Sequence, residues 1–424
     1  MKIILMSMPD VASVIMHESA FHMPNIGIAS IGANIDEGHQ VYIVDLIRKR
    51  DQLRNYVTGI MKKIKPDVVG LSAMAWQFKT CAKLARLVKT MMPETKIVIG
   101  GYHATLMYKE IAASGDASHI DFMIRGEGEE AFRRLVNALD GKDRLEEIPS
   151  LSYKKHGDEF FHNPRGELLD LSGLKRPIRD KRRLTDGYHI MLDKAEVIET
   201  SRGCTRSCNF CSMKHMYGRR FRAFPLERII ADIEDIYYNR KTRWIFVADD
   251  NLVMEPSRVM EICDAVISKK LHDLNFVAQA DCITMSQNEE MVRLMAQAGF
   301  KTVFLGIENV SRENLKTAGK GDIVEMSKKA VAVCHKYGIM VVGGMIFGFP
   351  DDNEEDIINN YRFLKSTGAD SYYCQILTPY PKTAIREYLL EEGLVTNADD
   401  FSRYNGMWAN VRTRHLSAEE LHYL

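Results

Sequence analysis

Residues 200–212 read Thr200-Ser201-Arg202-Gly203-Cys204-Thr205-Arg206-Ser207-Cys208-Asn209-Phe210-Cys211-Ser212 and follow a short apolar run that begins at Val197. Three cysteines at this spacing, on a loop that contains a glycine, can bring their thiolates to one metal centre. Zinc in structural sites normally takes four protein ligands, and the nearest candidate for the fourth is His215. An iron–sulfur cluster held by three cysteines instead leaves one iron open to a substrate molecule. The position of the loop, directly after a strand, favours the reactive cofactor.

The chain after this loop alternates short strands with helices. The expected strands are 197–200, 244–248, 276–280, 302–306, 340–345 and 371–376, and the helices between them are 226–238, 256–269, 288–297, 323–337 and 354–366. Six such units predict a partial (β/α)6 barrel, in which the reactive groups lie at the carboxyl ends of the strands. The cysteine loop occupies that end of the first strand.

The first 139 residues also alternate apolar runs with amphipathic segments, which predicts an α/β fold with a doubly wound, Rossmann-like parallel sheet. Such a sheet binds ligands at the carboxyl ends of its strands. Glycine at several of these ends allows a bulky ligand to approach the backbone closely. The strand-end sequences are Ser7-Met8-Pro9-Asp10, Asp45, Ser72-Ala73-Met74, Gly100-Gly101-Tyr102-His103 and Arg125-Gly126-Glu127-Gly128-Glu129.

These patterns divide the chain into four parts. We expect the first sheet domain over 1–139, a hairpin and linker over 140–194, the barrel over 195–390 and a C-terminal segment over 391–424. Because most residues of the run 175–183 are Lys or Arg, we expect that run to be a solvated linker.

Two smaller features flank the barrel. The hairpin covers 151–163 and turns at 156–158, where Gly157 stands between polar residues. The last helix begins at Ser417, which forms a capping box with Glu420. A helix this near the chain end either docks tightly or belongs to a longer region that has been cut, and we favour the cut.

Composition excludes several classes of protein. The 424 residues carry 57 Lys plus Arg and 57 Asp plus Glu, so the net charge gives no reason to expect nucleic acid or an anionic membrane as partner. No stretch approaches the roughly 20 apolar residues of a membrane span, and the first residues lack the features of a secretory signal. Eight cysteines are too few for a disulfide scaffold in a chain of this length. We therefore expect a cytoplasmic protein.

The cysteine loop resembles the motif of the radical S-adenosylmethionine (SAM) superfamily, which has this spacing and an aromatic residue before the last cysteine. The resemblance implies that Cys204, Cys208 and Cys211 bind a [4Fe–4S] cluster whose fourth iron chelates SAM. It also implies that SAM is contacted at the later strand ends. The residues that match are Phe210, Asp249, Asp250, Asn251, Gln279, Asp281, Glu308 in Gly-Ile-Glu, and Gly344 and Gly348 in a G-x-I-x-G-x-x-E motif that ends in Asp351.

The first domain resembles the cobalamin-binding domain that precedes the radical core in one large class of these enzymes. The resemblance implies that cobalamin lies against the strand ends. The matching residues are Ser72, Gly100, Gly101, His103, Gly126 and Glu127. The Asp-x-His-x-x-Gly motif that supplies a histidine to cobalt is absent after Asp10, and Met74 replaces the threonine of a Ser-x-Thr element. His17, His22 and His103 remain neighbours that could approach the cofactor.

The combined resemblance implies an enzyme with a [4Fe–4S] cluster, SAM and cobalamin that methylates an unactivated carbon of a lipid or secondary metabolite. It implies a small-molecule substrate and an external electron donor such as flavodoxin or ferredoxin, and no nucleic acid. Two alternatives stay open. One is an oxidative cyclase or hydroxylase that uses the same cofactors, as anaerobic porphyrin ester cyclases do. The other is a metal-binding or nucleotide-binding module without activity, and for the cysteines alone a zinc knuckle.

Overall fold

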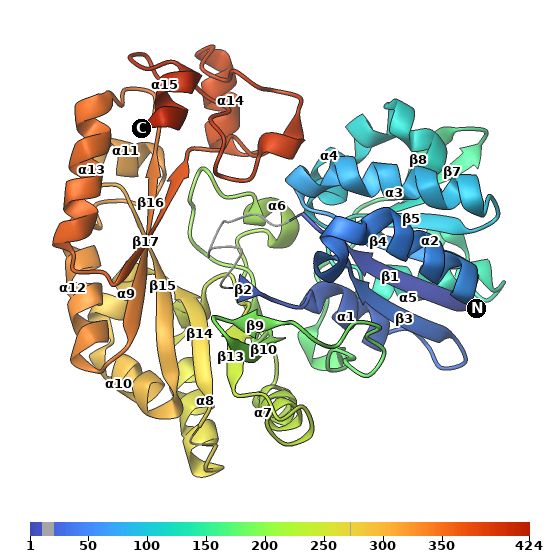
Figure 1. Cartoon of the computed structure of the whole chain (residues 1–424), viewed down its shortest axis with the longest axis horizontal. Coiled ribbons are helices and arrows are strands. Elements are labelled where there is room, and N and C mark those ends of the chain that lie inside the picture. The colour runs from blue at the N-terminus through green and yellow to red at the C-terminus, as the bar shows by residue number, and fades with distance from the viewer. Residues whose placement is uncertain (11–20, 272) are drawn as a thin grey trace. The chain divides into compact units, whose positions relative to one another are not determined.

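The computed structural model describes residues 1–10, 21–271 and 273–424. Among these, unit 1 comprises residues 1–10 and 24–187, and unit 2 comprises residues 21–23 and 188–424 (Figure 1). His17 lies outside the described residues. In the described part of the chain, no helix combines the length and the apolar character needed to span a bilayer.

Unit 1 is built on one sheet in which five parallel strands are followed by an antiparallel hairpin. The order across the sheet is β3 (Gln40–Asp45), β1 (Lys2–Ser7), β4 (Val68–Ser72), β5 (Lys96–Gly100), β6 (Phe122–Ile124), β7 (Leu151–His156) and β8 (Glu159–His162). The chain runs from the middle of the sheet outward in both directions, and the order reverses between β1 and β4. A sheet of this topology offers its ligand site at that reversal.

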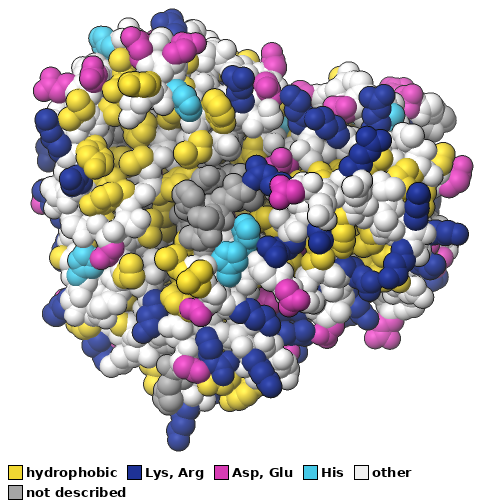
Figure 2. Space-filling model, in the orientation of Figure 1, with side chains coloured by type: hydrophobic (Ala, Val, Ile, Leu, Met, Phe, Trp, Pro, Cys, Tyr) yellow, Lys and Arg dark blue, Asp and Glu magenta, His cyan; other side chains and the backbone are white. Residues whose placement is uncertain are grey.

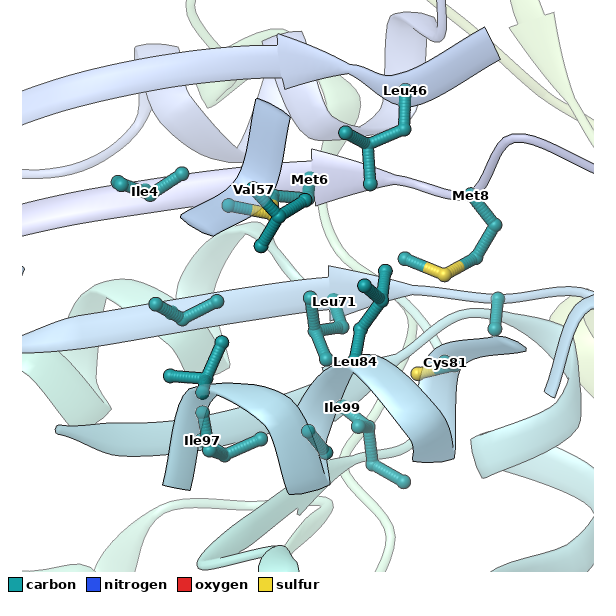
Figure 3. Close-up of a cluster of buried hydrophobic side chains, with 14 of the residues drawn as sticks. Ile4, Met6, Met8, Leu46, Val57, Leu71, Cys81, Leu84, Ile97 and Ile99 are labelled. Carbon is teal, nitrogen blue, oxygen red and sulfur yellow. The ribbon is translucent and has the colours of Figure 1, made fainter. Parts of the chain in front are cut away.

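Helices cover both faces of this sheet, because its strands are apolar on both sides. Ile4 and Met6 of β1 pack under α2 (Leu53–Ile64), α3 (Phe78–Met91) and α4 (Tyr102–Ala112), as Figure 3 shows for Val57 and Leu84. The intervening Ile3 and Leu5 face α1 (Ile26–Ala33) and α5 (Glu129–Leu139). Successive side chains of a strand point to opposite faces of the sheet, and here both faces are packed under helices. The doubly wound sheet predicted from the sequence is therefore confirmed.

The expected end of the first domain at residue 139 differs from the structure. The 151–163 hairpin forms as predicted, but β7 pairs with β6 and thereby extends the sheet of unit 1. The run 175–183 is not a free linker either. The backbone N–H of Ile178 donates to the carbonyl of Ala29, and that of Arg183 donates to the carbonyl of Ile43 on the edge strand. An edge strand has backbone N–H and C=O groups without partners in the sheet. The hairpin pairs with these groups on β6 and residues 181–183 pair with them on β3, so both segments belong to unit 1.

Unit 2 is built on an open, curled sheet with six parallel strands. The order is β17 (Ser371–Ile376), β16 (Met340–Phe347), β15 (Phe300–Glu308), β14 (Asn275–Ala280), β13 (Trp244–Val247), β10 (Asp193–Ile198), β9 (His189–Ile190) and β2 (Phe21–His22). Strand β9 pairs antiparallel with β10, and β2 pairs antiparallel with β9. The partial (β/α)6 barrel predicted from the sequence is confirmed.

Helices connect the parallel strands of unit 2 in chain order. The longer ones are α7 (Leu226–Glu234), α8 (Pro256–Ser268), α10 (Glu289–Ala298), α12 (Val324–Lys336) and α13 (Glu354–Ser366). Shorter helices follow several strand ends, namely α6 (Met213–Tyr217), α9 (Cys282–Gln287), α11 (Arg312–Thr317) and α14 (Ala384–Glu391). In Figure 1 the longer helices α8, α10, α12 and α13 line the outer side of the curled sheet, which leaves its inner side for the strand-end loops.

The C-terminal helix α15 (Ala418–Tyr423) docks onto unit 2. Ser417 caps it, since the Ser417 hydroxyl accepts from the N–H of Glu420 and the Glu420 carboxylate accepts from the N–H of Ser417. Leu421 is fully buried in the cluster that contains Phe349 and Ile376. Burial of an apolar side chain, rather than helix propensity, stabilises a helix of this length.

Candidate functional site

A cavity of about 340 Å³ lies in unit 2, at the carboxyl ends of the barrel strands. Its wall combines sulfur, charged and aromatic side chains from all parts of the barrel. Those used below are Cys204, Arg206, Cys208, Phe210, Cys211, Lys214, Arg219, Asp250, Asn251, Gln279, Asp281, Phe304, Gly306, Glu308, Lys320, Gly344, Met345, Ile346, Tyr373, Gln375 and Tyr380. This is the barrel end at which the sequence predicted the chemistry.

A two-stranded ribbon closes the cysteine loop at its base. Strand β11 (Ser201–Arg202) pairs with β12 (Arg222–Ala223), so residues 203–221 project as one excursion after β10. Gly203 begins the excursion with a φ of +85°, and a Cβ atom there would overlap the carbonyl oxygen of Arg220. Only glycine satisfies both conditions, which explains the Gly-Cys pair at the start of the loop.

The middle of the cysteine loop rests on the segment after α11. The backbone N–H of Asn209 donates to the carbonyl of Ala318 at 2.8 Å, and its side-chain amide donates to the carbonyl of Thr317 at 2.9 Å. Gly319 has a φ of +72°, and a Cβ atom there would lie 2.8 Å from the carbonyl oxygen of Ser207. Two distant parts of the sequence thus hold the loop in one conformation.

All three cysteines of the motif line the cavity as free thiols. Burial raises the pKa of each thiol, to about 12 for Cys211. Coordination to a metal is what stabilises the thiolate form in such surroundings. The structure therefore brings the three predicted ligands to one wall, in an environment where a bound cation would govern their charge.

The donor set on this wall fits an iron–sulfur cluster. Zinc in a structural site normally takes four protein ligands, whereas a [4Fe–4S] cubane can be held by three cysteines that each bind a different iron. Three cysteines line the cavity together, so the residues present fit the cubane.

The three polar residues after β13 have different environments. Asp249 is fully buried and does not line the cavity. Its carboxylate accepts from the N–H of Thr200 at 2.6 Å and from the hydroxyls of Thr200 and Ser201, and Arg258 lies 3.5 Å away. This carboxylate is used to hold the entry to the cysteine loop, so the expected contact of Asp249 with SAM does not match its position.

Asp250 and Asn251 do line the cavity. Burial raises the pKa of Asp250 to about 7, and the nearby Glu199 and Asp249 add to the increase, although the N–H of Gly203 donates to its carboxylate. The Asn251 amide donates to Asp281 and to the sulfur of Met254, each at 3.0 Å. Its carbonyl oxygen is buried and has no hydrogen-bond partner among the described residues. A buried acceptor of this kind calls for a ligand donor.

Asp281, which follows β14, serves mainly as an anchor. Burial alone would raise the pKa of its carboxyl, but hydrogen bonds from Asn251 and Thr284 and the charge of Arg206 lower it overall. Arg206 donates to Asp281 at 2.9 Å and thereby lies on the cavity wall. Gln279, two residues earlier, also lines the cavity. Asp281 therefore positions an arginine from the cysteine loop, a partnership that the sequence alone did not reveal.

A buried ion pair joins the end of β15 to the segment that supports the cysteine loop. Glu308 Oε1 lies 2.9 Å from Lys320 Nζ, and both side chains line the cavity. Burial opposes the charge of Lys320, but Glu308 and the thiol of Cys208 raise its pKa above the ordinary value. Gly306 allows this pair to approach the strand, since a Cβ atom there would lie 3.0 Å from Lys320 Nζ. The predicted Glu308 and its neighbour Lys320 are thus brought together.

The two glycines of the β16 motif have separate roles. Gly344 lines the cavity, and the ring of Phe304 occupies the space that its side chain would take. Gly348 lies away from the cavity with a φ of +87°, and a Cβ atom there would lie 2.8 Å from Leu421. The buried acid of this motif is Asp352, which accepts from the N–H groups of Gly348 and Phe349 at 2.8 and 3.0 Å. Asp351, expected in that place, is exposed and pairs with Arg414.

Apolar and aromatic side chains form the remaining wall. Phe210 from the cysteine loop, Phe304, Met345 and Ile346 lie there, together with Tyr373, Gln375 and Tyr380 near the end of β17. Tyr373 and Gln375 belong to β17, and Tyr380 follows it in the chain. Lys214 and Arg219 were not predicted from the sequence, because neither follows a strand; both belong to the excursion closed by β11 and β12.

The predicted cobalamin residues of unit 1 lie at the carboxyl edge of its sheet. Ser72 ends β4 and Gly100 ends β5, directly paired with each other. Gly101 has a φ of +90°, and a Cβ atom there would lie 2.7 Å from the carbonyl oxygen of Ala73. Glycine at position 101 therefore lets the backbone after β5 pack closely against the backbone after β4, at the edge where a sheet of this topology binds its ligand.

The other three predicted residues of unit 1 are held by their surroundings. His103, at the start of α4, is buried against the ring of Phe78, and burial lowers its pKa to about 4. Gly126 has a φ of +79°, and its N–H donates to the Thr105 hydroxyl at 2.8 Å. Glu127 accepts from the N–H of Leu169 at 3.0 Å. The edge is thus shaped by backbone geometry and a neutral imidazole.

Two family models match this chain. That of the B12 binding domain matches residues 12–136, and that of the radical SAM superfamily matches residues 198–364. The solved structure of the radical SAM methyltransferase TsrM from Kitasatospora setae, with cobalamin and a [4Fe–4S] cluster bound, has a TM-score of 0.74 and 17% identity. The alignment covers 94% of this chain and 79% of TsrM, which shows a common fold.

Curated relatives extend over most of this chain. A protein of Pyrococcus horikoshii, named uncharacterized methyltransferase PH0819, is 29% identical over 99% of this chain and 89% of its own length. The anaerobic magnesium-protoporphyrin IX monomethyl ester cyclase of Rubrivivax gelatinosus is 24% identical over 84% of this chain and 63% of its own length. Residues 12–136 thus match a B12 binding domain and residues 198–364 a radical SAM domain, and the chain is a cobalamin-dependent radical SAM enzyme that uses a [4Fe–4S] cluster, SAM and cobalamin.

Proposed function

We propose that the enzyme transfers a methyl group to an unactivated carbon of a lipid or secondary metabolite. The observation that carries the proposal is the cavity of unit 2, which places three free thiols, an ion pair and an aromatic wall around one space. When bound, the cluster and SAM supply a carbon-centred radical that abstracts hydrogen, and cobalamin supplies the methyl group. The residues of this chain bind, orient and shield these groups.

Cys204, Cys208 and Cys211 would hold the cluster. Support comes from their position on one cavity wall and from their burial. The loop is fixed from below by the segment that includes Ala318 and Gly319. A fixed loop keeps three irons in place, and it leaves the fourth corner free of protein ligands.

The methionine end of SAM has an ammonium and a carboxylate, and the cavity offers partners for both. Glu308 and Lys320 form a buried pair of opposite charge, which is the complement of such a zwitterion. The buried carbonyl oxygen of Asn251 would accept from the ammonium. Asp250 adds a second acceptor close by. Satisfying a buried acceptor and a buried ion pair from the ligand offsets their desolvation.

The apolar wall would hold the adenine ring and the body of the substrate. Phe210, Gln279 and the open backbone at Gly344 lie on the SAM side of the proposal. Tyr373 and Tyr380 offer flat faces and hydroxyls to the substrate. A wall of this character suits a largely apolar molecule with few polar groups.

Cobalamin would lie on unit 1, at the reversal of strand order between β1 and β4. Gly100, Gly101 and Gly126 would admit the corrin edge to the backbone, and Ser72 and Glu127 would offer polar contacts. His103 follows Gly101 at the start of α4 and would border the site. Because burial lowers its pKa, its imidazole would be neutral there and could accept or donate a hydrogen bond.

Anaerobic reconstitution tests the proposal. The full chain is supplied with iron, sulfide, cobalamin, SAM and dithionite, and incubated with lipid and metabolite extracts. We expect 5′-deoxyadenosine and S-adenosylhomocysteine together, and a product that has gained one carbon and two hydrogens. Absence of deoxyadenosine from protein with a full iron content would contradict the assignment of the cavity.

A second candidate is oxidative cyclisation or hydroxylation with the same cofactors. It is favoured by the similarity to the Rubrivivax gelatinosus cyclase over 84% of this chain. The same assay separates the two reactions. Deoxyadenosine without S-adenosylhomocysteine, and a product that has gained no carbon, would favour the second candidate.

A further inference from the structure

The excursion that carries the cysteines and the two ribbon strands that close it are strongly basic. Residues 200–226 contain six Lys or Arg and no Asp or Glu, although the whole chain has 57 of each kind. The six are Arg202, Arg206, Lys214, Arg219, Arg220 and Arg222. A local excess of one sign in a neutral chain creates a directed field at that part of the surface.

Three of these cations are engaged within unit 2. Arg202 forms a two-pronged ion pair with Glu199, Arg206 pairs with Asp281, and Arg222 lies over the ring of Tyr217. These side chains contribute to the structure of the loop. The other three cations have no such contact within the part of the chain that the structure describes.

Lys214, Arg219 and Arg220 form no ion pair within the described ranges of the chain, and we call them the cationic surface. Lys214 lies on α6 and is half-buried, whereas Arg219 and Arg220 are exposed. Arg219 and Arg220 are consecutive in the chain and Lys214 lies on the same excursion. Like charges near one another repel, so an external anion would stabilise this group.

The cationic surface adjoins the cluster ligands. Lys214 and Arg219 line the cavity together with the three cysteines. The carbonyl of Arg220 packs directly against Gly203, the residue before Cys204. An anionic partner at this surface would therefore lie next to the part of the loop that binds the cluster.

We propose that the cationic surface is the docking site for an acidic electron-transfer protein of the flavodoxin or ferredoxin class. The inference rests on the proposed function, because the bound cluster must gain one electron for each SAM that it cleaves. The reduced donor is oxidised by one electron and the cluster is reduced by one. Redox complexes of this kind are small and transient, and charge complementarity governs their rate of association.

Charge reversal at Arg220 tests the proposal. Arg220 lies outside the cavity wall, so Arg220→Glu changes the surface without changing the cavity. Lys301→Glu is the matched control: Lys301 is also exposed, but it lies at the start of β15, the strand end opposite to the cavity. The full chain is loaded with its cluster, and a reduced bacterial flavodoxin or dithionite is the electron source.

With flavodoxin, we expect Arg220→Glu to slow reduction of the cluster on the order of ten-fold at low salt, measured by the loss of cluster absorbance after mixing. Binding of oxidised flavodoxin, measured by calorimetry without SAM, should weaken in parallel and become less dependent on salt. Arg220→Lys should restore both. With dithionite, Arg220→Glu and the unsubstituted chain should form deoxyadenosine at the same rate.

Equal rates of reduction by flavodoxin in Arg220→Glu, Lys301→Glu and the unsubstituted chain would overturn the proposal. So would an equal loss with dithionite and flavodoxin, because the residue would then act on the cavity, for example through an anionic substrate. Failure of the unsubstituted chain to form deoxyadenosine with dithionite would instead contradict the proposed function. The calorimetric comparison still decides the docking site in that case.

Discussion

In both units the candidate ligand site is the carboxyl edge of a parallel sheet, but the residues at that edge differ. In unit 1, the edge includes glycines with positive φ, such as Gly101 and Gly126, which set the path of the backbone there. In unit 2, the edge carries three thiols and the Glu308–Lys320 ion pair. The difference shows how one architecture serves two purposes. A bare backbone admits a large preformed cofactor, whereas converging side chains assemble a reactive centre.

The edge of unit 2 should lose its cluster completely when one cysteine ligand is removed. We expect Cys208→Ala to abolish cluster binding and deoxyadenosine formation, because two thiolates do not retain the cubane. Iron and sulfide analysis of the reconstituted full chain measures this. Cobalamin binding by unit 1 should persist.

Cys263→Ala is the control for that variant. Cys263 is buried in α8 and does not line the cavity, so the change should cost about 1 kcal/mol of stability and leave the iron content unchanged. Full iron content in Cys208→Ala would contradict the assignment of the ligand.

The edge of unit 1 should lose affinity for cobalamin when a side chain is added at Gly101. Gly101→Ala places a Cβ atom 2.7 Å from the carbonyl of Ala73 at a φ of +90°. We expect at least about a ten-fold loss of cobalamin affinity, or about 1.4 kcal/mol. Absorbance titration of the full chain with cobalamin measures it, and iron content should not change.

Gly115→Ala serves as its control, since a Cβ atom there meets open space without positive φ. If Gly101→Ala binds cobalamin as tightly as Gly115→Ala does, the glycine edge of unit 1 is not the cobalamin site.

The C-terminal helix should depend on one apolar side chain. Leu421 is fully buried and packs against Gly348, so Leu421→Ala should lower the free energy of unfolding of unit 2 by about 2–5 kcal/mol. Arg414→Gln breaks only exposed ion pairs with Asp351 and Glu392 and should cost less than about 1 kcal/mol. Urea unfolding measures both. A larger effect at Arg414 would show that charge, not burial, holds the segment.

A dependence on pH should arise in unit 1 from His103. Its pKa is about 4 in the folded chain because of burial, against an unfolded value of about 6.5. Between these values the unfolded chain binds a proton that the folded chain does not. The free energy of unfolding therefore falls as pH drops from about 6.5 toward about 4, by at most about 1.4 kcal/mol per pH unit.

His103→Phe should remove this part of the slope. Urea unfolding at about pH 7 and about pH 5 measures it, and the value at about pH 7 corrects for altered packing against Phe78. An unchanged slope in the variant would show that other groups cause the loss of stability in acid.

The agreement between sequence and structure follows the range of the interactions involved. Alternating apolar runs report burial within a few residues, so the strands and most helices were placed well. The hairpin at 151–163 was found, but its membership in the first sheet was not, because β6 and β7 meet through pairing that the sequence does not mark. The same holds for residues 181–183, which bond to the edge strand β3 through backbone groups.

The site shows the same division. The cysteines and Glu308 could be found from motifs, since each lies at a strand end. Lys320 as the partner of Glu308, Arg206 as the partner of Asp281, and Asp352 as the buried acid required three-dimensional contacts. Asp249 matched a motif, but its carboxylate accepts hydrogen bonds from Thr200 and Ser201 and does not line the cavity.

The sequence by itself determined the two folds, the three thiols and the basic character of their loop, because these depend on local patterns of polarity and on spacing along the chain. Only the tertiary structure decided which charges are paired, which acceptors are left open and which glycines relieve a clash. Those properties depend on atoms from distant segments that meet in space, and their energies follow distance and burial rather than order in the chain.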